Sequence, residues 1–146
     1  MIVCIGNELI ADDAVGFEIY NRPAGCGARL EYCGVGGVDL LPLIEGETDM
    51  VVVDAVRFGS PPGTIHVIPW GSLPRGGGDI SSHGLGLRET IEIGTTLYPG
   101  EMPERITLVG IEGRCFNRTR EYMTGEVRDA IGTAVKTIEE LVARGH

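Results

Sequence analysis

The chain has few cations and no long apolar run. Among its 146 residues, 12 are Lys or Arg and 21 are Asp or Glu, which gives a net charge of −9. Because nucleic acids and anionic membranes are bound by clustered cations, this balance argues against both as partners. No apolar run is long enough to span a bilayer, and the sequence begins with an apolar segment that has no basic n-region before it. We therefore expect a cytoplasmic protein without a secretory signal.

Several catalytic and binding motifs are also absent. No Cys-x-x-Cys pair is formed by the four cysteines, Cys4, Cys26, Cys33 and Cys115. This argues against a zinc knuckle and favours reduced thiols, with Cys4 buried inside a strand. The sequence has neither a Gly-x-Ser-x-Gly elbow nor a phosphate-binding Gly-rich loop, which argues against a serine hydrolase and a nucleotide-binding domain. A Cys–His pair formed in space stays open as an alternative.

What is present is an alternation of strand-like and helix-like segments. Apolar, strand-like runs occur at residues 2–5, 28–33, 50–54, 64–68 and 105–110, and helical spacing occurs at 14–20, 39–44, 84–98 and 124–143. Such alternation is typical of an α/β fold. We predict a single domain over residues 1–146, with a twisted, mostly parallel sheet of about five strands and helices on both faces. Residues 69–82 are rich in Gly, Pro and Ser and are expected to form a long loop.

Polar side chains follow the predicted strands at one edge of this sheet. Asp12 and Asp13 come after the first strand, Asp54 ends the run MVVVD, and His83 stands at the predicted start of a helix. Ligands of open α/β sheets bind at the carboxyl ends of the strands, where these residues could meet. Carboxylates together with an imidazole suit a divalent first-row metal. Asp13, Asp54 and His83 are thus one candidate metal site.

Each candidate also has a structural interpretation. For Asp12 we favour a helix N-cap over a site role, and for Asp13 we do not, since two adjacent residues cannot cap in the same way. Asp54 is equally consistent with accepting backbone N–H bonds from the next loop. Taken alone, His83 is more typical of a structural residue. His66 alternates within a strand and could simply face solvent.

The combination of motifs resembles the hydrogenase maturation endopeptidases, which trim the C-terminus of the large subunit of nickel–iron hydrogenases. No single motif would be specific, but together they follow the family order and span most of the chain. The matching segments are GNELIADDAVG (6–16), GVGGVDLL (34–41), VVVDAVRFGSPPGTI (51–65), SSHGLGL (81–87) and LVGIE (108–112).

The resemblance implies a site and a substrate. By motif, its metal-contact triad falls on Asp13, Asp54 and His83, and the spare carboxylate of Asp12 is a weaker candidate for a catalytic base. The metal would be nickel presented by the large-subunit precursor, rather than an ion bound tightly by the isolated protein. Another possibility is a non-catalytic chaperone that uses the same triad to sense nickel. The chain departs from the family at residues 32–35, Tyr-Cys-Gly-Val, where many members have Asp-Gly-Gly-Thr.

Overall fold

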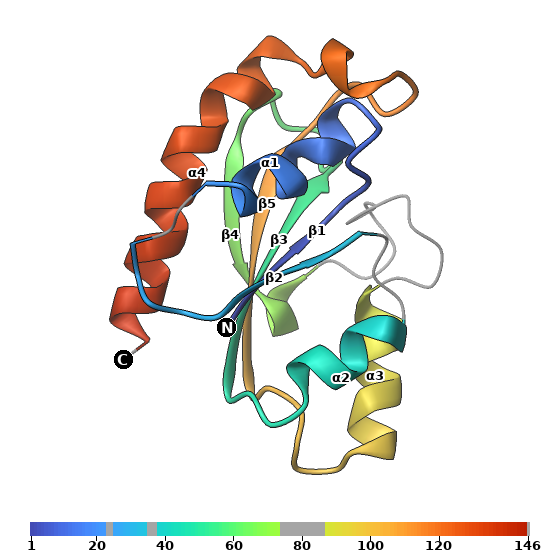
Figure 1. Ribbon diagram of the computed structural model, residues 1–146, viewed down its shortest axis with the longest axis vertical. Helices are drawn as coiled ribbons and strands as arrows, with labels where there is room; N and C mark the ends of the chain where they lie inside the picture. Colours follow the sequence, from blue (N-terminus) through green and yellow to red (C-terminus); the bar gives the residue numbers. More distant parts are fainter. Residues whose placement is uncertain (23–24, 35–37, 74–86, 146) are drawn as a thin grey trace.

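One five-stranded sheet organises the protein, in the order β2-β1-β3-β5-β4 (Figure 1). The computed structural model describes residues 1–22, 25–34, 38–73 and 87–145. Neighbouring strands are parallel except for β4, which pairs antiparallel with β5 at one edge. The predicted α/β class and mostly parallel sheet are confirmed. The strands are β1 (Ile2–Ile5), β2 (Leu30–Cys33), β3 (Asp49–Val56), β4 (Ile65–Pro69) and β5 (Arg105–Glu112).

Helices cover both faces of the sheet. The helices α1 (Val15–Tyr20) and α4 (Gly125–Arg144) pack on one face, whereas α2 (Leu41–Ile44) and α3 (Leu87–Leu97) pack on the other (Figure 1). Short 3-10 turns connect these elements: η1 (Asp12–Ala14), η2 (Val38–Leu40), η3 (Trp70–Ser72) and η4 (Arg120–Tyr122).

The apolar run in β3 explains this two-layered core. Successive side chains of a strand point to opposite faces. Val51 and Val53 accordingly pack with α1 and α4, while Met50 and Val52 pack with α2 and α3. A strand buried on both faces is continuously apolar rather than alternating, as the sequence indicated.

The long C-terminal helix follows its predicted spacing. It begins after Thr124, and a stripe along it is buried against the sheet: Val127, Ile131, Ala134, Ile138 and Val142. Three- and four-residue spacing puts these side chains on one face. No helix in the described part of the chain is long and apolar enough to cross a membrane.

Two strands extend further than the sequence suggested. We expected β3 to end at Asp54 and β5 at Gly110, but both continue for two residues, and Val56 pairs with Glu112 at their shared end. Mutual pairing of the two strands supplies the backbone hydrogen bonds that make this extension favourable. Asp54 therefore lies inside a strand rather than at its last position. Most of the expected loop at 69–82 and the first residues of the helix expected at 84–98 fall outside the described residues.

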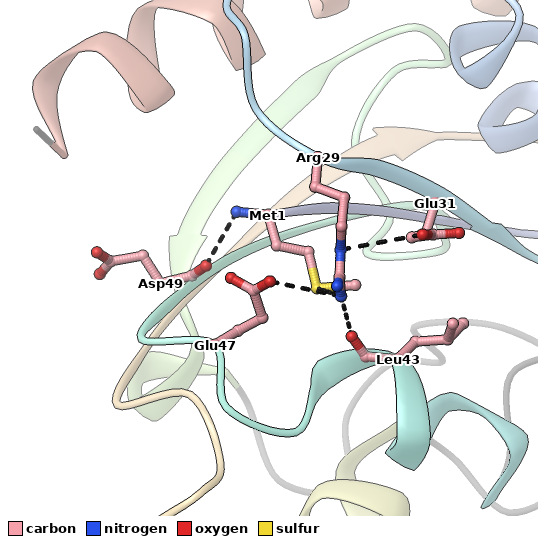
Figure 2. A network of polar contacts seen from close by, with 6 residues as sticks. All are labelled: Met1, Arg29, Glu31, Leu43, Glu47 and Asp49. Carbon is pink, nitrogen blue, oxygen red and sulfur yellow. Dashed lines mark hydrogen bonds and ion pairs between the residues drawn. The ribbon is translucent and has the colours of Figure 1, made fainter.

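A polar network closes the opposite, amino-terminal edge of the sheet (Figure 2). The guanidinium of Arg29 donates a hydrogen bond to the carbonyl of Leu43 and lies 3.4 Å from a carboxylate oxygen of Glu47. The N-terminal ammonium group of Met1 donates to the carbonyl of Asp49 at 3.2 Å. A cation at the C-terminal end of a helix is favourable, here for α2. The network ties β1, β2 and β3 to that helix, at the edge away from the candidate site.

Candidate functional site

The first loop returns to the end of β1 because two glycines allow close backbone contact. Gly6 has φ +147°, and a Cβ there would lie 2.2 Å from the carbonyl oxygen of Asp13. A Cβ on Gly16 would lie 2.2 Å from the carbonyl oxygen of Ile5. Only glycine permits both approaches. The spacing of glycines in GNELIADDAVG thus places η1 directly against the carboxyl end of β1.

Asp13 stabilises this loop through a hydrogen bond inside it. Its side chain is buried, with 1% of its surface exposed, and its Oδ2 accepts a hydrogen bond from the backbone N–H of Asn7 at 3.0 Å. The hydroxyl of Tyr32 donates to the carbonyl of Gly6 on the same turn. The segment 32–35, which departs from the family pattern, therefore stabilises the turn at Gly6 through the hydroxyl of Tyr32.

Asp54 is equally buried. Its exposed fraction is 1%, and its Oδ1 accepts a hydrogen bond from the N–H of Ala55 at 2.8 Å. From the sequence, Asp54 was equally consistent with accepting backbone N–H bonds from the next loop. This bond agrees with that alternative in part, because the donor is a backbone N–H but belongs to the same strand. Because η1 packs against β3, the elements that hold Asp13 and Asp54 are in contact.

The third residue of the predicted triad, His83, lies outside the described residues. Among the residues that the structure does describe, no group of three His, Cys, Asp or Glu side chains could hold a metal ion. The metal site of Asp13, Asp54 and His83 therefore stays a prediction.

Asp12 does not cap its own helix, so our N-cap interpretation was wrong. The helix expected at residues 14–20 is α1, whose N-cap is Ala14, and the N-cap of the preceding turn η1 is Ala11. Neither position forms a side-chain cap bond. The fully buried carboxylate of Asp12 instead accepts four hydrogen bonds from the segment between β5 and α4. The donors are the N–H of Arg114 (2.7 Å), the N–H of Cys115 (2.8 Å), and the N–H (2.6 Å) and hydroxyl (2.7 Å) of Thr124.

This arrangement also changes the expected role of Thr124. The residue is the N-cap of α4 as predicted, but its side chain makes no cap bond, since its hydroxyl donates to Asp12. The carboxylate of Asp12 lies at the positive N-terminal end of α4, which favours a negative charge. Asp12 is therefore an anchor between two loops of the sheet edge.

A further buried carboxylate, Glu112, was missed by sequence reasoning. Its Oε1 and Oε2 each lie 3.0 Å from the N–H of Phe58, and its Oε1 lies 3.1 Å from Nε2 of His66. The suggestion that His66 faces solvent was therefore wrong: its side chain is 17% exposed and contacts Glu112. The available signal was the sequence LVGIE, where an acidic residue ends an apolar strand just as in MVVVD.

Burial also changes the acidity of two groups near the site. Desolvation raises the pKa of the Cys4 thiol to about 12, and the nearby negative charge of Asp54 adds to the rise. Desolvation likewise raises the pKa of Tyr32, with the Glu8 carboxylate as the next cause. Both groups thus stay protonated at neutral pH, and the predicted burial of Cys4 inside a strand is confirmed.

The protein has clear relatives of known fold. Hydrogenase maturating endopeptidase HybD from E. coli aligns with 99% of this chain and 91% of its own, with a TM-score of 0.78 and 21% identity. The [NiFe] hydrogenase maturation protease HybD from Thermococcus kodakarensis aligns over 97% of both chains, with a TM-score of 0.79 and 22% identity. At these identities the likeness demonstrates a shared fold.

Sequence comparison identifies the family. Hydrogenase expression/formation protein HupD from Rhodobacter capsulatus is 32% identical over 94% of this chain and 70% of its own length. The HupD protein from Rhizobium leguminosarum bv. viciae is 26% identical over the same shares. The hydrogenase maturation protease family profile, HycI, matches residues 32–141, which is most of the chain. The protein therefore belongs to the hydrogenase maturation protease family.

Proposed function

We propose that this protease removes the C-terminal extension of a nickel–iron hydrogenase large-subunit precursor after nickel has been inserted. Asp13, Asp54 and His83 would contact the nickel that the precursor presents. The metal belongs to the substrate and signals that assembly is complete. Membership in the maturation protease family supports the reaction class.

One observation is the main support for the site. Asp13 and Asp54 are each only 1% exposed, yet they lie on contacting elements at the carboxyl end of the sheet. Burying a carboxylate is costly, and ligands of open α/β sheets bind at this edge. Both carboxylates also accept backbone hydrogen bonds, from Asn7 and Ala55, and we infer that binding a ligand at this edge further offsets the cost of burying them.

The side chains of Asp13, Asp54 and His83 suit the recognition of a metal ion that is held mainly by ligands of the precursor. Two carboxylates and an imidazole are acceptable ligands for nickel but leave coordination positions open. Ligands from the precursor would occupy those positions. The metal can polarise a carbonyl or lower the pKa of a bound water toward ~7. Asp13 and Asp54 would orient the substrate. We assign Asp12 an anchoring role in place of the proton-transfer role considered from the sequence, because its carboxylate accepts hydrogen bonds from the 113–124 segment.

A cleavage assay tests this function. The purified protein is mixed with nickel-loaded precursor, and intact mass is measured over time. We expect loss of a C-terminal peptide with the wild-type protein and none with Asp54→Asn, which keeps an oxygen for the N–H of Ala55. The matched control is Asp49→Asn in the same strand, where Asp49 pairs with Arg105 at the opposite edge. Binding without any mass change would instead indicate the metal-sensing chaperone.

A further inference from the structure

Arginine side chains stacked on aromatic rings gather at the same edge of the sheet as Asp13 and Asp54. Arg57, just after β3, lies 4.0 Å from the ring centroid of Phe116, and Arg118 lies 4.7 Å from that of Tyr122. We call these four residues the arginine rim. A cation above an aromatic face is held by the ring quadrupole, so both guanidinium groups have defined positions.

The backbone beneath the rim is fixed. The N–H of Ala11 donates to the carbonyl of Arg118, and Ile10 and Thr119 form an isolated antiparallel bridge. Together with the anchor at Asp12, these bonds join the segment 113–124 to the loop after β1. In Figure 1 the orange segment that follows β5 lies beside the blue turn that precedes α1. A rim held in this way binds a partner without a large ordering cost.

The charges of the rim are available to a partner. Arg114 and Arg120, in the same segment, lie 3.9 Å from Glu126 and Glu18 respectively. Within the described residues, Arg57 and Arg118 form no ion pair with a carboxylate. Four of the 12 cations of the chain thus occupy two loops at one edge, although the protein as a whole has a net charge of −9.

The rim is exposed, and an exposed apolar side chain lies in the adjoining loop after β1. Tyr122 is 53% exposed, and Leu9, next to the bridging residue Ile10, is 68% exposed. Arg and Tyr are the residue types that most often dominate the binding energy of interfaces. An apolar side chain beside charged planar groups suits a peptide better than a phosphate backbone, and the acidic remainder of the surface would repel a polyanion longer than the rim.

We propose that the arginine rim docks an acidic, extended segment of a partner protein. The planar guanidinium groups of Arg57 and Arg118 would bind carboxylates, each through two parallel hydrogen bonds. Resting on the proposed function, we assign this segment to the large-subunit precursor, because the rim lies at the edge where the precursor would present its metal.

A peptide-binding experiment tests the rim independently of cleavage. The probe is a short, fluorescently labelled oligoglutamate peptide, no longer than the rim, whose binding to the whole protein is measured by anisotropy at low ionic strength. The test variant is Arg57→Gln/Arg118→Gln, and the control is Lys136→Gln/Arg144→Gln on exposed positions of α4. Both variants lose the same charge. We expect the rim variant to bind roughly tenfold more weakly and the control to bind like wild type.

Two outcomes would overturn the proposal: no binding by the wild-type protein, or equal weakening in both double variants, which would mean that net charge alone attracts the peptide. Circular dichroism checks the fold of each variant. If the double variant unfolds, Arg118→Gln alone replaces it with the same criteria, because Ala11 bonds only its backbone carbonyl.

A second arm tests the assignment to the precursor. With nickel-loaded precursor, the rim variant should show a raised KM and an unchanged kcat, since docking precedes chemistry. An unchanged KM would reject the precursor as the docked partner. If wild-type protein fails to cleave the precursor at all, the proposed function fails, while the peptide experiment still decides whether the rim binds acidic segments.

Discussion

The carboxylate of Asp12 accepts hydrogen bonds from both the backbone N–H and the hydroxyl of Thr124, 112 positions later in the chain. This contact links the loop after β1 to the start of α4. It also fixes the loop that contains the neighbouring residue, Asp13, since this loop is held by β1 on one side and by the start of α4 on the other. The stability of the fold and the geometry of the candidate site thus depend on the same carboxylate.

Replacing Asp12 by Asn should destabilise the protein by about 2–4 kcal/mol. The four hydrogen-bond donors around Asp12 now bind two carboxylate oxygens, whereas an amide offers them only one acceptor oxygen. Urea unfolding measures the loss. Asp39→Asn, at an exposed position, should change stability by less than about 0.5 kcal/mol. Equal stability of wild type and Asp12→Asn would contradict the anchoring role.

Gly16→Ala should be severely destabilising, because the added Cβ would meet the carbonyl oxygen of Ile5 at 2.2 Å. We expect a loss of about 3 kcal/mol or more in the free energy of unfolding. The control is Gly132→Ala in α4, where a Cβ meets nothing within 4 Å. There alanine should stabilise the helix by about 0.5–1 kcal/mol. Similar effects at the two glycines would refute the close contact.

The contact between Glu112 and His66 should appear as an energetic coupling. Glu112→Ala should cost about 2–3 kcal/mol, since the N–H of Phe58 loses its acceptor, and His66→Ala should cost about 1 kcal/mol. The loss of unfolding free energy in the double variant should be smaller than the sum of the two single losses by about 1 kcal/mol. Thermal or urea unfolding of all four proteins completes the cycle. Strict additivity would mean that the two side chains do not interact.

Cys4 should make stability fall at alkaline pH. Its pKa rises from 9.0 to about 12 on folding, so above pH 9 the unfolded chain loses a proton that the folded protein keeps. Its contribution is therefore complete below pH 9 and is lost progressively as pH rises toward 12. Unfolding free energies measured between pH 8 and about 11 should fall more steeply for wild type than for Cys4→Ala. Tyr32 titrates in both proteins, so its effect cancels in the comparison, and parallel pH profiles would contradict the prediction.

The fold was largely predictable because local patterns agree with tertiary packing. The helical stripe of α4 has a period that fits only a helix, and the short apolar run in β3, with its three consecutive valines, favours a buried strand by its length and composition. Strand ends were less predictable, since the extension of β3 past Asp54 depends on pairing with β5. Such pairing joins residues far apart in sequence and leaves no local pattern.

The site was predictable in part, for a similar reason. The positions of Asp13 and Asp54 at the sheet edge follow from strand order, and both are buried there. The role of Asp12 could not be read from its neighbours, because its donors lie more than 100 residues away. His66 was misjudged in the same way: alternation describes which face a side chain takes, but not that Glu112 lies on that face.

The most direct test of the account compares nickel-loaded and nickel-free large-subunit precursors. Each is incubated with the wild-type protein, and intact mass reports whether a C-terminal peptide is released. The account predicts release from the nickel-loaded precursor alone. Equal cleavage of both precursors would contradict the role of nickel as the recognition signal, and an intact nickel-loaded precursor would contradict the proposed reaction.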